Sequence, residues 1–187
     1  MLDPAVAQVL AALPSPPPDT APPTLEERRQ GYEQVRSLQG GARELEDIRN
    51  LVAVHDGTRV PVRLYRPPSS RGPGNGQEAV LPLLVFAHGG AWILGSLDLV
   101  DVPARELAVR GQVAVLTVGY RLAPEHPYPA ALDDVLAATA WAVAHADELG
   151  VDPARVAVGG ESAGGTSQPQ PLYAPATSTA PPWRCSC

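Results

Sequence analysis

The sequence has few cysteines, no surplus of basic charge and no long apolar run, and each absence excludes a class of protein. Its only cysteines are Cys185 and Cys187. Because no other Cys and no nearby His completes a tetrahedral set, we interpret them as incidental and expect no metal. A formal net charge of -6 and a pI near 5.1 disfavour nucleic acid or an anionic membrane as a partner. No stretch approaches the roughly 20 apolar residues of a membrane helix, and without a basic region before an apolar one we expect no signal peptide and a cytoplasmic protein.

A further absence concerns the residues that follow a candidate nucleophile. Residues 160–164, Gly-Glu-Ser-Ala-Gly, come directly after a short apolar run that predicts a buried strand. A G-x-S-x-G turn after a strand is typical of the nucleophile elbow of an α/β-hydrolase, in which the acid and then the histidine come later in the chain. From Ala163 to Cys187, however, there is no Asp, no Glu and no His. Ser162 is therefore a candidate nucleophile whose usual partners are missing.

The rest of the composition indicates one folded α/β domain. The chain has 187 residues, of which 44% are hydrophobic and 18% charged, enough for a real core. From residue 81 onward the expected order is β, α, β, α, β, which predicts right-handed crossovers and a parallel sheet. An antiparallel hairpin is expected before it, around Asp56-Gly57. The expected helices cover about 3–13, 24–40, 101–110 and 130–149, and the expected strands 45–66 (the hairpin), 81–87, 113–118 and 152–158.

Three segments follow from this pattern. Residues 1–44 hold two helices and a proline-rich linker, and Thr24 begins the second helix with the S/T-x-x-E form of a capping box. Residues 45–165 form the core, and 166–187 are irregular and rich in proline, which forbids a regular helix after the elbow. We interpret this tail as frameshifted. We back-translated the start of the tail with GC-rich codons and shifted the reading frame back by one base. The shifted frame encodes Asn-Leu-Ala-Ala-Ala-Ala, a strong helix former.

Residues 88–92, His-Gly-Gly-Ala-Trp, are the second chemical motif. Glycine lets a backbone approach a ligand closely, so the N–H groups of this turn can point at a developing oxyanion together with that of Ala163. Ala91 stands where a third glycine would be, and it keeps its N–H without penalty provided that its φ is not positive. A plain glycine-rich turn is the alternative for the motif by itself, but the elbow downstream favours an oxyanion hole.

Three motifs together resemble the hormone-sensitive-lipase-like family of α/β-hydrolases over residues 1–165. They are residues 88–92, the run Tyr-Arg-Leu-Ala-Pro-Glu-His-Pro-Tyr-Pro-Ala at 120–130, and Gly-Glu-Ser-Ala-Gly-Gly at 160–165. The resemblance implies the N-terminal half of that fold, truncated after the elbow: a mostly parallel sheet with an antiparallel N-terminal hairpin and two cap helices. It also implies a carboxylic-ester hydrolase that acts on small-molecule esters without a cofactor.

The resemblance assigns roles to individual residues. Ser162 is the implied nucleophile, Gly89, Gly90 and Ala163 supply the implied oxyanion hole, and Glu161 has a structural role. The family's acid and His lie in its C-terminal half, where this sequence has no counterpart. From the residues alone, the loop at 120–130 is rigid, and its Arg–Glu pair, Arg121 and Glu125, could brace the elbow.

One of four earlier histidines could replace the missing base. They are His55, His88, His126 and His145, of which His126 is the best placed and His88 is a motif member rather than a base. Our main hypothesis is an ester hydrolase fragment that is inactive by itself, because removal of the base of a serine hydrolase lowers kcat on the order of 10⁶-fold. The alternatives are a non-catalytic small-molecule-binding protein of the same fold and an unstable fragment without function.

Overall fold

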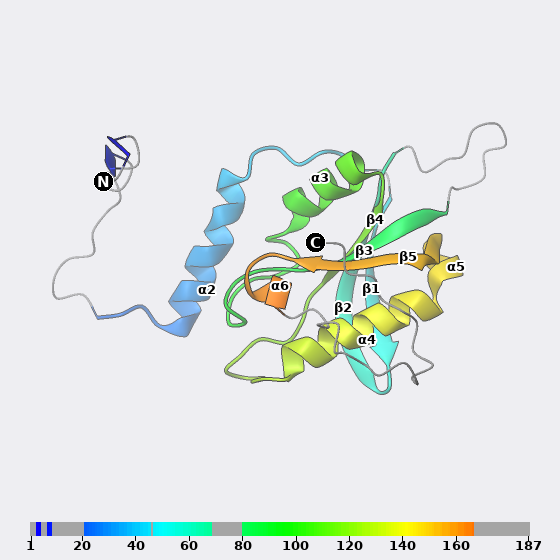
Figure 1. The fold of residues 1–187 in the computed structure, drawn as a ribbon. Coiled ribbons are helices and arrows are strands. Elements are labelled where there is room, and N and C mark those ends of the chain that lie inside the picture. The colour runs from blue at the N-terminus through cyan, green and yellow to red at the C-terminus, as the bar shows by residue number, and fades with distance from the viewer. Residues whose placement is uncertain (1–2, 5–6, 9–20, 46, 69–79, 167–187) are drawn as a thin grey trace.

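The computed structural model describes residues 3–4, 7–8, 21–45, 47–68 and 80–166, and shows a five-stranded mixed sheet with helices on both faces (Figure 1). The strand order is β1-β2-β4-β3-β5. Most of the helix expected at 3–13 and the tail from 167 to 187 lie outside the described residues. The fold class predicted from the sequence, half of an α/β-hydrolase, is confirmed.

The hairpin forms the antiparallel part of the sheet. Strand β1 spans Asp47–His55 and β2 spans Thr58–Arg66. The two residues between them, Asp56 and Gly57, have φ angles of 47° and 80°. Both values are left-handed, as a type I′ turn requires, and an Asp-Gly pair meets that requirement at low cost. Strand β2 then pairs antiparallel with β4, so the hairpin extends the sheet at one edge.

The parallel part positions the chemistry. Strand β3, Leu81–Ala87, lies between β4, Ala114–Val118, and β5, Val151–Gly160, and is parallel to both. The carboxyl ends of parallel strands meet at one edge of a sheet. The residues that follow β3, β4 and β5 are therefore brought together although they are far apart in sequence.

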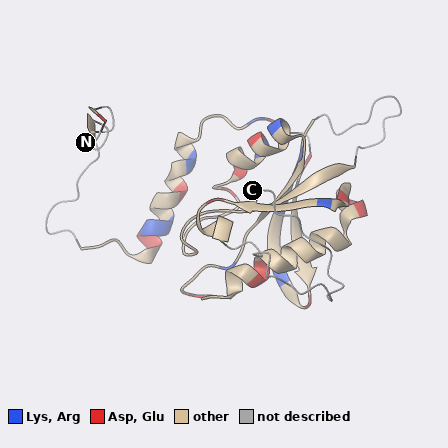
Figure 2. Ribbon diagram, viewed as in Figure 1, with Lys and Arg blue, Asp and Glu red and all other residues tan. Residues whose placement is uncertain are grey.

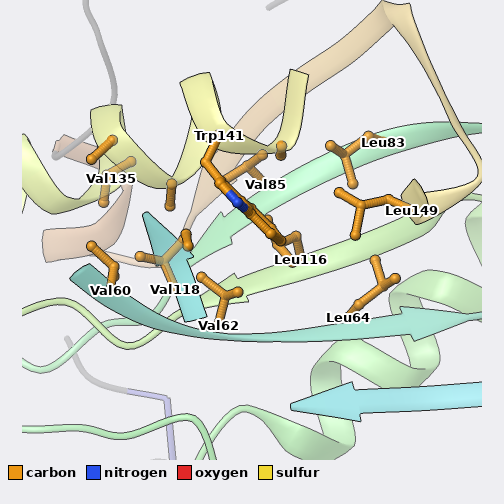
Figure 3. Close-up of a cluster of buried hydrophobic side chains, with 14 of the residues drawn as sticks. Val60, Val62, Leu64, Leu83, Val85, Leu116, Val118, Val135, Trp141 and Leu149 are labelled. Atoms are coloured by element: carbon orange, nitrogen blue, oxygen red, sulfur yellow. The ribbon is translucent and has the colours of Figure 1, made fainter. Parts of the chain in front are cut away.

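Two helices cover the faces unequally. Helix α4, Ala130–Ala144, packs against β1 and β2 over the larger core, which Figure 3 shows. Helix α3, Asp101–Gly111, lies on the other face over a smaller cluster. The side chains labelled in Figure 3 are Val60, Val62, Leu64, Leu83, Val85, Leu116, Val118, Val135, Trp141 and Leu149.

Two expectations about these elements need correction. Strand β3 was expected to be buried on both faces, but its residues alternate between buried and half-buried because α3 covers only part of the second face. The helix expected at 130–149 ends at Ala144 and resumes as α5, Ala146–Leu149. At the break His145 stacks on Trp141, with 4.9 Å between ring centroids, and its Nδ1 lies 2.9 Å from the carbonyl oxygen of Trp141.

The N-terminal helix stands at the edge where the parallel strands end (Figure 1). Helix α2 spans Leu25–Glu33, and the predicted capping box between Thr24 and Glu27 is present. A 3₁₀ turn, η1, continues it over Gln34–Leu38. No helix in the described ranges is both long and apolar enough to cross a bilayer.

Candidate active site

Ser162 lies on a tight turn between β5 and α6, Ala163–Thr166. Its φ is +50°, a left-handed value that costs a non-glycine residue roughly 1–2 kcal/mol. The glycines on either side make the turn sterically possible. A Cβ on Gly164 would lie 2.1 Å from the carbonyl oxygen of Ala87, and one on Gly160 would lie 2.5 Å from the carbonyl carbon of Gly164. This is the strand–turn–helix geometry that G-x-S-x-G predicts.

The glycine-rich loop after β3 packs directly against this turn. The N–H of Glu161 donates to the carbonyl oxygen of Ala87 at 3.2 Å. A Cβ on Gly89 would lie 3.2 Å from the carbonyl oxygen of Glu161, and one on Gly164 would lie 2.6 Å from that of His88. Gly89 and Ser162 therefore come from two motifs whose backbones are in contact, as the sequence predicts. Their roles as oxyanion donor and nucleophile stay predictions.

The same loop has a strained backbone. Gly90, Ala91 and Trp92 have φ angles of 120°, 52° and 62°. The substitution of alanine for a third glycine was expected to be harmless at negative φ, and that condition is not met. Ala91 keeps its N–H, but in a conformation that costs a non-glycine residue roughly 1–2 kcal/mol. A Cβ on Gly90 would lie 2.2 Å from the carbonyl oxygen of Leu94, so glycine is required there.

His88 braces this loop. Its side chain is buried and its Nδ1 lies 2.7 Å from the carbonyl oxygen of Gly89. The ring stacks on Tyr120 with 4.1 Å between centroids, and the Tyr120 hydroxyl donates to the carbonyl oxygen of His88 at 2.8 Å. Burial lowers the pKa of His88, which keeps the ring neutral at pH 7 and Nδ1–H available as a donor. These contacts agree with the expectation that His88 is a motif member and not the base.

The other three histidines lie elsewhere. His55 Nε2 is 3.4 Å from Asp56 Oδ2 at the hairpin turn, and His145 stacks on Trp141. His126 lines a cavity of about 390 Å³ beside the elbow, whose wall also includes Ala91 and Thr166. Within the part of the chain that the structure describes, no side chain hydrogen-bonds to the Ser162 hydroxyl.

The loop that follows β4 is braced differently from the sequence-based interpretation. Arg121 and Glu125 do not pair with each other. Arg121 binds the buried carboxylate of Asp134 on α4, at 2.7 Å from Nη2 to Oδ1, and Glu125 binds Arg29 on α2. Sequence reasoning missed Arg29 and Asp134, because neither lies in a motif and only the tertiary fold brings them to this loop.

Tyr32, in the C-terminal turn of α2, is influenced by the charge of the elbow. Burial raises the pKa of Tyr32, and the negative charge of Glu161 adds to the shift. Glu161 directly precedes Ser162, so the charge next to the elbow acts on a side chain of α2. No cluster of three or more His, Cys, Asp or Glu suited to a metal ion occurs among the residues described.

Comparisons with known proteins agree with this arrangement. Residues 84–167 match a family model described as alpha/beta hydrolase fold. Carboxylesterase NlhH of Mycobacterium tuberculosis is 53% identical over 112 residues, which are 59% of this chain and 33% of that protein. Ethyl acetate hydrolase of Pseudomonas putida is 43% identical over 142 residues, or 75% of this chain and 43% of that protein.

Solved structures give the same result. An esterase of Pyrobaculum calidifontis superimposes with a TM-score of 0.73 and 31% identity, over 89% of this chain and 50% of that one. The chain thus spans half the length or less of these three relatives. Within that span it has the strand order, the elbow and the glycine-rich loop described above. Over this span the chain is similar to α/β-hydrolases named as esterases, in agreement with the resemblance to the hormone-sensitive-lipase-like family.

Proposed function

We propose that this protein carries the nucleophile half of a carboxylic-ester hydrolase. The observation that supports the proposal best is the backbone contact between the loop at 88–92 and the elbow at Ser162. A carbonyl group bound there is attacked by the serine oxygen while its own oxygen faces backbone N–H groups. Relatives named carboxylesterase and ethyl acetate hydrolase support small or medium esters as the substrate class.

The reaction has two steps. The Ser162 oxygen forms a bond to the ester carbonyl carbon, and the negative charge on the carbonyl oxygen is stabilised by N–H groups of Gly89, Gly90 and Ala163. The alcohol then leaves with a proton, and water releases the acid from the acyl-serine. Both steps need a base to accept the proton of the serine or of the water.

The 187 residues provide no such base along the usual chain order. No Asp, Glu or His follows Ala163, and the described part of the chain holds no hydrogen-bond partner for the serine hydroxyl. We therefore propose that the chain by itself turns over esters at close to background rate. We also propose that residues 1–44 form a cap over the core at 45–165.

A chimera tests the hydrolase function. Residues 1–165 are joined to the remaining C-terminal part of the M. tuberculosis carboxylesterase NlhH, in which the resemblance places the acid and the histidine. The chimera is expected to hydrolyse p-nitrophenyl butyrate, and Ser162→Ala is expected to abolish that turnover. A chimera that folds, by circular dichroism and a cooperative melt, but has no Ser162-dependent turnover would contradict the proposal.

The cavity beside the elbow favours a second candidate, ligand binding without catalysis. Its volume is about 390 Å³ and its wall contains Trp92, Pro127 and Leu132. This candidate predicts that the chain binds an uncleaved ester analogue equally well with and without the serine hydroxyl. Equal binding by the chain and by Ser162→Ala, together with an inert chimera, would favour it over the hydrolase.

A further inference from the structure

A single side chain of α2 is bonded both to the glycine-rich loop after β3 and to the loop after β4. Arg29 Nε donates to the carbonyl oxygen of Ile93 at 3.0 Å, and its Nη2 donates to that of Ala123 at 3.1 Å. Its Nη1 and Nη2 also hold the two carboxylate oxygens of Glu125, at 2.7 and 2.8 Å. Figure 2 shows basic and acidic residues on α2, the helix that stands at this edge of the sheet. The guanidinium thus has three partners on two loops.

One of those partners adjoins the strained stretch of the glycine-rich loop. Ile93 directly follows Ala91 and Trp92, which have positive φ angles. A left-handed conformation at a non-glycine residue persists only where the surrounding structure holds it in place. Within the loop, the N–H groups of Ile93 and Leu94 both donate to the carbonyl oxygen of Gly90, at 3.1 and 2.9 Å.

Two further bonds hold the loop from outside. The N–H of Ala123 donates to the carbonyl oxygen of Trp92 at 2.9 Å, which ties the two loops together. The second is the bond from Arg29 to Ile93, and it comes from the N-terminal helix. Glu125 orients the guanidinium for it, because a carboxylate and a guanidinium match as two parallel hydrogen bonds.

We infer that Arg29 is a positioning residue for the oxyanion loop. It holds residues 89–93 in the conformation that directs their N–H groups toward the reacting oxygen, and it makes that conformation depend on the docking of α2. The purpose of the loop rests on the proposed function; the coupling between α2 and the loop does not. The planar fork is essential, because a lysine carries a point charge and cannot bind Glu125 and two carbonyl oxygens in this geometry.

Hydrogen exchange of the 187-residue chain, followed by mass spectrometry, tests the coupling. In Arg29→Gln we expect amide exchange to rise by about tenfold in α2 and also at 89–95. The β1–β2 hairpin is expected to be unchanged. Arg28→Gln is the matched control, because Arg28 is an exposed neighbour on the same helix, and it should change neither segment. Arg29→Lys should restore much of the protection of α2 but not that of the loop.

A rise confined to α2 in Arg29→Gln would overturn the inference, since Arg29 would then only dock the helix. If Arg29→Gln unfolds the whole sheet, the hairpin will exchange faster as well, and Glu125→Gln is then used in its place. A rise in exchange both in α2 and at 89–95 in Glu125→Gln would support the inference, and a rise in α2 alone would overturn it. Exchange does not depend on ester turnover. An inert chimera together with coupled exchange would therefore remove the proposed function and leave the coupling intact.

Discussion

Backbone strain is concentrated in the residues that surround the elbow. Ala91, Trp92 and Ser162 all have a positive φ, whereas the other such non-glycine residues in the described chain, Asp56 and Gln112, lie at a hairpin turn and a helix end. Strained conformations cluster where a fold must aim a group at a ligand. At the scale of single residues, backbone strain in both the glycine-rich loop and the elbow is therefore the feature that most clearly distinguishes the candidate site from the rest of the sheet.

Ala91→Gly should stabilise the protein. Ala91 is exposed and left-handed, so glycine removes the Cβ penalty and we expect the free energy of unfolding to rise by about 1 kcal/mol. The same substitution inside α4, Ala140→Gly, should lower it by about 1 kcal/mol. Urea denaturation measures both. Destabilisation by both substitutions would show that Ala91 is not strained.

Replacements of Ser162 separate its hydroxyl from its backbone. Ser162→Ala removes the hydroxyl and keeps the Cβ, whereas Ser162→Gly removes both. Because the φ is +50°, we expect Ser162→Gly to be more stable than Ser162→Ala by about 1 kcal/mol, again by urea denaturation. Equal stability of the two variants would argue against a strained elbow.

Among the elements, the docking of α2 should depend on pH through Glu125. The hydrogen bonds from Arg29 lower the pKa of Glu125 from 4.5 to about 2. A carboxyl group whose pKa is lower in the folded protein stabilises it above the unfolded pKa, and this stabilisation is lost as the pH falls toward the folded pKa. The difference in unfolding free energy between the native chain and Glu125→Gln should therefore be constant above about pH 5.

Between pH 4.5 and about 2 that difference should shrink. Urea midpoints of both proteins at several pH values measure it, and the comparison cancels the titration of the other carboxylates. The pair is exposed, so added salt should reduce the difference as well. If the difference in unfolding free energy between the native chain and Glu125→Gln were the same at pH 6 and pH 3, the assignment of Arg29 as the partner of Glu125 would be contradicted.

Strand β5 is an edge of the described sheet, and this predicts association. It pairs with β3 on one side, and Ala157 is exposed while Val156 and Val158 are half-buried. An open edge with apolar side chains pairs readily with another chain. Ala157→Lys should therefore lower concentration-dependent light scattering, whereas Ala144→Lys, at the exposed end of α4, should not. An equal effect of both would mean that net charge, not the edge, controls association.

The element boundaries show what local sequence can predict. The hairpin, the capping box at Thr24 and strand β3 follow from turn chemistry, capping and apolar runs, and each lies where it was expected. The break at His145 and the half-buried face of β3 depend on packing partners, which periodicity does not show. The partners of Arg121 and Glu125, which are Asp134 and Arg29, were missed for the same reason.

At the scale of the whole molecule, the motifs predict where the candidate site lies, but they do not show which residue could act as its base. Two glycine-containing turns at the ends of β3 and β5 are local signals, and a parallel sheet brings such ends together. A base is a distant residue that only the fold can supply. The chain spans half or less of the three relatives compared above, and none of its four histidines bonds to Ser162 among the described residues.

The most direct measurement is the steady-state hydrolysis of p-nitrophenyl butyrate by the 187-residue chain, compared with its Ser162→Ala variant. Equal rates are expected, because a serine hydroxyl without a base loses on the order of 10⁶ in kcat. Turnover that depends on Ser162, and that His126→Ala removes, would contradict this by showing that an earlier imidazole serves as the base.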